Sequence, residues 1–130
     1  MTGPELAQAA EALVGTPFRL HGRDPATGLD CVGLLAASAG IELPRGYRLR
    51  MRALPDLAAI AAAAGFGAAE GAIRPGDVLM ARVSPCQFHL LVAAGAERFV
   101  HAHAGLGRVV HWYGPLEWPV VGRWRLPETA

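Results

Sequence analysis

The chain has 130 residues, the length of one domain, so we expect a single domain over residues 1–130. Apolar residues make up 52% of the chain and charged residues 18%, a composition that argues against a disordered protein. The formal net charge of +1, from 12 basic and 11 acidic residues, gives no electrostatic reason to expect a nucleic acid as the partner.

The first residues, Met1 to Gln8, contain no basic stretch followed by an apolar core, so we expect no secretory signal. No apolar run approaches the roughly 18 residues that a transmembrane helix requires. The sequence therefore predicts a protein that is made in the cytoplasm and has no membrane span.

The first predicted element is a short amphipathic helix over Pro4–Val14, with Thr2 or Gly3 as its cap and Gly15 at its end. Residues Gly15–Leu29 hold several glycines and prolines, which predicts mostly loop.

A second helix is predicted over Cys31–Ala39, because Asp30 can cap its start and Gly40 can end it. A third helix is predicted over Leu54–Ala64, which has a proline in its first turn.

The pattern changes at Pro75-Gly76, which predicts a type II turn with glycine at the position of positive φ. Short strand-like runs follow at Asp77–Arg82, Phe88–Ala94, Arg98–His103, Arg108–Trp112 and Val120–Leu126. Their connections are short, so we expect an antiparallel meander. The fold class predicted is α+β, with N-terminal helices packed on an antiparallel sheet of about five strands.

Trp112, Tyr113 and Trp118 are expected either to form an interface or to pack under a loop.

Cys31 is the most informative single residue, because it lies in the first turn of a helix that Asp30 can cap. The N–H groups and the dipole at this end favour the thiolate, the nucleophilic form of cysteine. Gly28 and Gly33 would let a substrate backbone come close. The alternative is a small buried core residue. Cys86 follows Ser-Pro in a turn and is expected to be packed or exposed rather than catalytic.

His89 and His101 lie on consecutive predicted strands. If Ala94-Gly95-Ala96 forms the loop, Ala93 pairs with Glu97 and the two histidines lie directly opposite each other. One ring could then orient the other, as a general base requires. A one-residue slip would place them on opposite faces, and two unrelated polar residues on a solvated face remain the alternative.

His103 shares the face of His101 and is the alternative orienting residue, whereas His111 is expected at the surface without a partner. A zinc site is a further possibility, since Cys86, His89, His101 and His103 form C-x-x-H followed by H-x-H. Strand alternation places Cys86 on the face opposite His89 unless a bulge intervenes, so we favour a site without a metal or other cofactor.

The run Gly15–Leu34, G-T-P-F-R-L-H-G-R-D-P-A-T-G-L-D-C-V-G-L, resembles the active-site stretch of the NlpC-type papain-like cell-wall cysteine peptidases. Their pattern is G-T-P-Y-x-W-G-G-x-x-x-x-G-x-D-C-S-G-L. The resemblance continues through P-G-D-V-L at Pro75–Leu79 and R-F-V-H-A at Arg98–Ala102. The segments F-V-H-A-H and V-V-G-R-W-R-L-P look most like the phage-tail and gene-transfer-agent branch.

This resemblance implies a papain-like α+β fold in which Cys31 is the nucleophile, His89 the general base and His101 the residue that orients the base. The backbone N–H of Cys31 would help to stabilise the oxyanion. Asp30 matches an aspartate that contributes to recognition of the substrate peptide, besides capping the helix.

Three positions depart from the family pattern. Phe18 stands where the family usually has a tyrosine whose hydroxyl lies near the oxyanion, Val32 replaces a serine, and His21 replaces a glycine. Phe18 and His21 are therefore candidate substrate-binding residues, and we expect these departures to affect substrate recognition more than the nucleophile.

The leading functional prediction is an endopeptidase that hydrolyses peptidoglycan stem peptides between γ-D-glutamate and diaminopimelate through an acyl-enzyme. One alternative is a catalytically weak or inactive structural component of a phage-like tail. Another is an amidase or transpeptidase with the same thiol chemistry. The expected partners are a peptidoglycan peptide and phage-like tail proteins, and the expected place of action is the periplasm or cell wall, reached in a phage-like particle.

Overall fold

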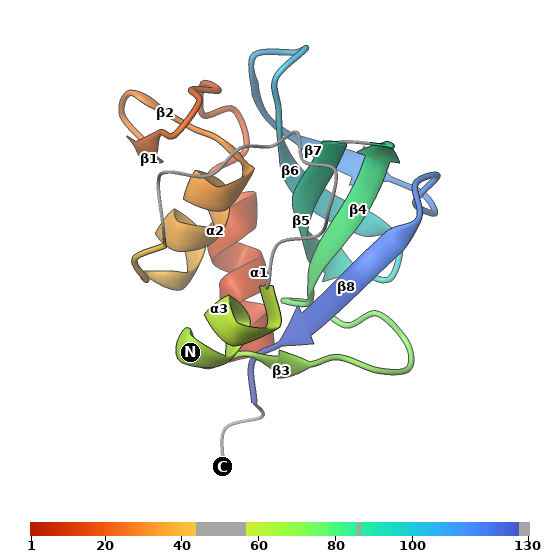
Figure 1. Ribbon diagram of the computed structural model, residues 1–130. Coiled ribbons are helices and arrows are strands. Elements are labelled where there is room, and N and C mark those ends of the chain that lie inside the picture. The colour runs from red at the N-terminus through yellow and green to blue at the C-terminus, as the bar shows by residue number, and fades with distance from the viewer. Residues whose placement is uncertain (44–56, 86, 128–130) are drawn as a thin grey trace.

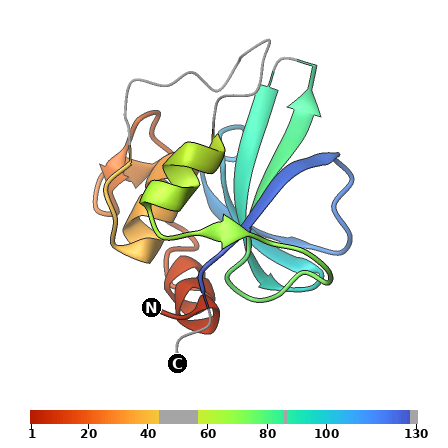
Figure 2. The same ribbon diagram turned by 60° about the horizontal axis from the view of Figure 1, so that its bottom comes forward.

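The computed structural model describes residues 1–43, 57–85 and 87–127, with helices on one side of an antiparallel sheet (Figures 1 and 2). The helices are α1 (Gly3–Glu11), α2 (Cys31–Ala39) and α3 (Leu57–Ala63). A two-stranded sheet of β1 (Arg23–Asp24) and β2 (Gly28–Leu29) precedes α2, within the region predicted as mostly loop.

The main sheet has six strands in the order β3-β8-β4-β5-β6-β7, all antiparallel to their neighbours as predicted. The strands are β3 (Gly67–Ala68), β4 (Val78–Ser84), β5 (Gln87–Gly95), β6 (Arg98–His103), β7 (Arg108–Tyr113) and β8 (Val120–Arg125). The five predicted strands all form, with small differences at their ends. The sequence did not predict β3, because glycine and alanine carry no strand preference.

The helix α1 begins at a capping box. The Thr2 hydroxyl accepts a hydrogen bond from the Glu5 N–H at 3.3 Å, and the Glu5 carboxylate accepts one from the Thr2 N–H at 2.9 Å. The helix ends at Glu11, before the predicted Val14, because the chain tightens there into turns that let the Gly15 N–H bind the Val109 carbonyl of β7.

The helix α2 has the bounds that the sequence predicts. The Asp30 carboxylate accepts a hydrogen bond from the Gly33 N–H at 2.7 Å, and Gly40 ends the helix with φ of 67°. The third helix is described from Leu57 and ends at Ala63, while residues 54–56 of the predicted helix lie outside the described residues.

The expected meander is correct for β4 to β7 and wrong for β8, which returns across the sheet to pair with β4. Leu116 and Trp118, in the connection that leads to β8, pack on the sheet face opposite the helices. Because these two residues cover Leu79 and Leu91 on that face, the chain returns to the edge of β4 that β5 does not occupy.

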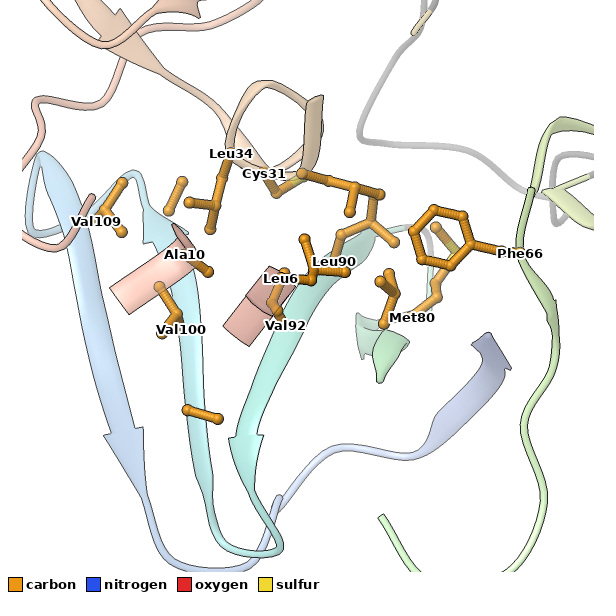
Figure 3. Packing of buried hydrophobic residues seen from close by; sticks show 14 of the residues in the cluster. Leu6, Ala10, Cys31, Leu34, Phe66, Met80, Leu90, Val92, Val100 and Val109 are labelled. Atoms are coloured by element: carbon orange, nitrogen blue, oxygen red, sulfur yellow. The ribbon is translucent and has the colours of Figure 1, made fainter. Parts of the chain in front are cut away.

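The sheet therefore separates two apolar clusters. The helix-facing cluster joins Leu6 and Ala10 of α1 and Leu34 of α2 to alternate residues of β4, β5 and β6, as Figure 3 shows. The opposite cluster contains the intervening residues, such as Leu91 and Phe99. Strand alternation thus decides which side of the sheet each residue of β5 and β6 faces.

Asp77, at the start of β4, is fully buried and joins this strand to β8. Its carboxylate accepts hydrogen bonds from Arg125 Nε at 2.7 Å and from Arg123 Nη2 at 3.3 Å. The Arg74 N–H also binds it, across the turn in which Gly76 has the predicted positive φ. Burial alone raises the pKa of Asp77, but the hydrogen bonds from Arg125, Arg74 and Arg123 hold it below its ordinary value.

We expect Asp77→Asn to lower the free energy of unfolding by about 3–5 kcal/mol, because it leaves the two arginines without a neutralising charge. Urea unfolding followed by circular dichroism measures this change. The matched control is Asp24→Asn, at an exposed carboxylate. Equal losses of stability in the two variants would contradict the role given to Asp77.

Candidate active site

Cys31 begins α2 and is only 2% exposed, within the helix-facing cluster (Figure 3). Burial raises the pKa of the Cys31 thiol to about 12, although the backbone N–H of Leu90 acts in the opposite direction. The expectation of a thiolate at this position is therefore wrong for this arrangement. The helix dipole favours the thiolate, but the loss of hydration on burial has the larger effect on the pKa of Cys31.

Cys31 lies in the helix-facing cluster with Leu90, the residue that follows His89, and the Leu90 backbone is near enough to lower the pKa of the thiol (Figure 3). The His89 side chain shares the sheet face of Leu91, away from the helix-facing cluster. Among the described residues, the thiol makes no hydrogen bond to a histidine ring. The structure thus brings the cysteine to the backbone beside His89 but leaves the thiol and the imidazole on different sides of the strand.

The two histidines of the predicted pair do contact each other. His89 Nε2 lies 2.8 Å from His101 Nδ1, and the rings are 4.9 Å apart at an interplanar angle of 87°. The strand register differs from the predicted one, because Ala93 pairs with Phe99 and a bulge follows at Ala94. Both registers place the two histidines on the same face. In the observed register they are diagonal neighbours instead of directly opposed, and their rings still meet.

A single proton lies between these two ring nitrogens, and its position decides what His89 can do. If His89 Nε2–H donates to His101, then His89 Nδ1 is unprotonated and can accept a proton from a thiol. In the opposite arrangement His101 Nδ1–H donates to His89 Nε2, so the one unprotonated nitrogen of His89 is already occupied by that hydrogen bond. If His101 orients His89, it does so by favouring the tautomer in which His89 Nε2–H donates to His101.

The histidine pair is neutral. Burial lowers the pKa of His89 to about 3, and the charges of His101 and His103 add to this effect. Burial likewise lowers the pKa of His101 to about 4, again with a contribution from His103. At neutral pH the site therefore holds a protonated thiol and an uncharged imidazole.

His103, the alternative orienting residue, has a different partner. Its Nδ1 accepts a hydrogen bond from the Leu106 N–H at 2.9 Å, which stabilises the turn after β6. Its ring centroid is 5.5 Å from that of His101, so it packs beside the pair. The ring hydrogen-bonded to His89 is that of His101.

Trp118 covers the histidine pair on the face opposite the helices. Its ring centroid is 6.4 Å from those of both His89 and His101, and Trp112 packs against it at 5.4 Å. Trp112 and Trp118 pack on the second apolar cluster, whereas Tyr113, the third aromatic residue of this group, is exposed. A tryptophan in the connection between β7 and β8 carries no sequence signal for a contact with β5 and β6.

Asp30 holds the loop before the cysteine against α2. Besides the Gly33 N–H, its carboxylate accepts hydrogen bonds from the His21 N–H at 2.8 Å and from Arg23 Nη1 at 3.2 Å. His21 is exposed and has a left-handed φ of 59°, a conformation that explains why glycine is usual here in the family pattern. Phe18 is half-buried, and its N–H binds the Gly107 carbonyl at 2.8 Å.

The expectation for Gly28 and Gly33 is wrong. A Cβ at Gly33 would lie 1.9 Å from the Gly22 carbonyl oxygen, and one at Gly28 would lie 2.7 Å from Arg19 Cβ. These glycines make room for the protein's own loop rather than for a substrate backbone.

His111 was expected at the surface without a partner, but its Nε2 lies 3.1 Å from a carboxylate oxygen of Glu11. It is half-buried and joins β7 to α1.

The zinc interpretation included Cys86, which lies outside the described residues. Within the described ranges, no group of three or more His, Cys, Asp or Glu side chains could hold a metal ion. Likewise, none of the described helices is long and apolar enough to cross a bilayer.

Comparison with solved structures identifies the fold. NlpC1 from Trichomonas vaginalis superposes with a TM-score of 0.68 at 22% identity, over 95% of this chain and 43% of that one. NlpC2 from the same organism gives 0.67 at 19% identity, over 95% and 48%. The NlpC/p60 domain of the peptidoglycan hydrolase SagA gives 0.61 at 21% identity, over 87% and 90%. The chain thus spans less than half the length of the two Trichomonas structures.

The structural neighbours are NlpC/p60 domains, and the predicted α+β papain-like fold class is confirmed. No family model and no curated protein sequence matches the chain.

We expect His89 and His101 to keep neutral-imidazole chemical shifts from about pH 8 down to about pH 5, in ¹H–¹⁵N spectra of the ring nitrogens. The unfolded chain takes up protons on these rings at higher pH than the folded one, so stability should fall as the pH drops below about 6.5. Titration of His89 near its ordinary pKa of 6.5 in the folded protein would contradict the burial described.

We expect Cys31 in the folded protein to react with iodoacetamide at pH 7 far more slowly than in urea, because the thiol is buried and protonated. A Cys86→Ser background leaves Cys31 as the reacting thiol, and mass spectrometry follows its modification. Rates that are equal with and without urea would show that the resting thiol is accessible.

Proposed function

We propose that the chain is a cysteine peptidase that cleaves peptidoglycan stem peptides, with Cys31 as nucleophile, His89 as general base and His101 as the orienting residue. The observation that carries the proposal is the 2.8 Å contact between His89 Nε2 and His101 Nδ1, since His89 directly precedes Leu90, a residue of the cluster that contains Cys31. The similarity of fold to the NlpC/p60 domain of the peptidoglycan hydrolase SagA adds support.

The chemistry starts from a protonated thiol and a neutral imidazole. Cys31 Sγ attacks the carbonyl carbon of the scissile amide while its proton passes to His89 Nδ1. The tetrahedral oxyanion binds the Cys31 N–H at the start of α2. The intermediate collapses to a thioester, and the departing amine takes the proton from His89. Water then attacks the thioester with His89 again as base, which releases a carboxylate and the thiol.

This scheme requires the substrate to bring the sulfur and His89 Nδ1 together, because β5 separates them in the resting structure. The proposed bond is the amide between γ-D-glutamate and diaminopimelate, as the resemblance of Gly15–Leu34 implies. An amidase or transpeptidase would form the same thioester and differ only in the bond attacked or in the acceptor.

We place the chain in the phage-tail and gene-transfer-agent branch on the segments F-V-H-A-H and V-V-G-R-W-R-L-P. Its partners would then be phage-like tail proteins, and it would act on the cell wall from a phage-like particle.

One observation favours a second candidate, a catalytically inactive structural component of such a tail. The Cys31 thiol is 2% exposed and has a raised pKa, which is how a cysteine that only fills the core behaves.

We expect Cys31→Ala to abolish the release of cleaved muropeptides, and His89→Ala to lower kcat by about 10²–10⁴-fold, since a positioned base contributes that much. Mass spectrometry of products from purified muropeptides measures both effects and identifies the bond. The control is His111→Gln, at a histidine that binds Glu11. Equal product from wild type and Cys31→Ala would favour the structural candidate.

A further inference from the structure

Arg82 lies on β4 directly opposite Phe88 of β5. Its guanidinium carbon is 5.2 Å from the centroid of the Phe88 ring. Phe88 is 3% exposed and belongs to the helix-facing cluster that also contains Cys31. The positive charge of Arg82 is therefore held on the face of the sheet against which α2 packs.

Among the residues that the structure describes, this cation has no acidic partner. Arg82 is half-buried, and its buried Nε makes no hydrogen bond. Four other arginines each pair with a carboxylate, namely Arg23, Arg98, Arg123 and Arg125. Over the part of the chain that the structure describes, no carboxylate pairs with Arg82. A ring contact replaces only part of the hydration that such a cation loses, so the described residues leave the charge of Arg82 without a neutralising anion.

Arg82 also lies on the side of the sheet that holds the candidate nucleophile. Cys31, Phe88 and Leu90 belong to the same helix-facing cluster, and Phe88 precedes Leu90 by one alternation on the same face of β5. That spacing is about 7 Å along a strand, and Arg82 lies opposite Phe88. Figure 1 shows the start of α2 and the start of β5 at the same end of the molecule. A substrate peptide bound along this end of the sheet would therefore meet both the guanidinium and the sulfur on the same side.

We propose that Arg82 binds a free carboxylate of the substrate beside the scissile amide, an inference that rests on the proposed function. A guanidinium binds a carboxylate through two parallel hydrogen bonds, and this geometry distinguishes it from an amide of the same shape. A γ-D-glutamyl–diaminopimelate bond has such groups on both sides: the α-carboxylate of glutamate on the acyl side and the carboxylates of diaminopimelate on the amine side. The substrate class is therefore an acidic peptide.

The test uses the peptide L-Ala-γ-D-Glu-diaminopimelate and two amidated forms, one at the glutamate α-carboxyl and one at the diaminopimelate carboxyls. We expect Arg82→Gln to raise KM for the free acid about tenfold to a hundredfold. It should leave KM unchanged for the amidated peptide that lacks the recognised carboxylate. That peptide then identifies the side of the scissile bond to which Arg82 binds. Arg82→Lys should retain part of the effect, and Arg108→Gln, at an exposed arginine, should show none. Thermal unfolding of each variant checks that the fold survives.

Binding of the same peptides to Cys31→Ala protein, followed by NMR, separates this inference from the proposed function. If no peptide is cleaved but the free acid binds more tightly than one amidated form, and Arg82→Gln removes that difference, the inference stands and the peptidase proposal fails. If Arg82→Gln affects all three peptides equally or not at all, the inference is overturned while cleavage can persist. If none of the three peptides binds, the inference is also overturned.

Discussion

The buried carboxylate of Asp30 is the interaction on which the candidate site depends. It caps α2 at Gly33, holds the preceding loop through the His21 N–H, and neutralises Arg23. Each of these contacts positions the residue that follows, Cys31, relative to the sheet. The same full burial means that its oxygens are occupied by the protein's own groups. In this arrangement the Asp30 carboxylate positions the loop before Cys31.

The local features of the fold could be predicted because they depend on residues close in sequence. The cap at Asp30, the end at Gly40 and the turn at Pro75-Gly76 form where the residue types require them. The return of β8 to β4 could not be predicted, because it depends on the burial of Leu116 and Trp118 against distant strands. Two-residue strands such as β3 carry no pattern to detect.

For the candidate site, the parity of the strands was enough to place His89 and His101 on one face, even though their predicted register was wrong. The electrostatic state of Cys31 was missed for a physical reason. A dipole at a helix start can be read from the sequence, but the depth at which that start is buried depends on the whole packing, and burial has the larger effect here. The partner of His111 is likewise a residue on α1, far away along the chain.

The contact between Asp77 and Arg125 joins residues that are 48 positions apart. During synthesis the Asp77 carboxylate emerges long before the arginines that neutralise it, and β4 lacks one of its two neighbours until β8 follows. A nascent chain that has completed β4 to β7 exposes an unpaired strand edge and an uncompensated buried charge. Folding of this sheet must therefore wait for β8 to leave the ribosome, after all the other strands.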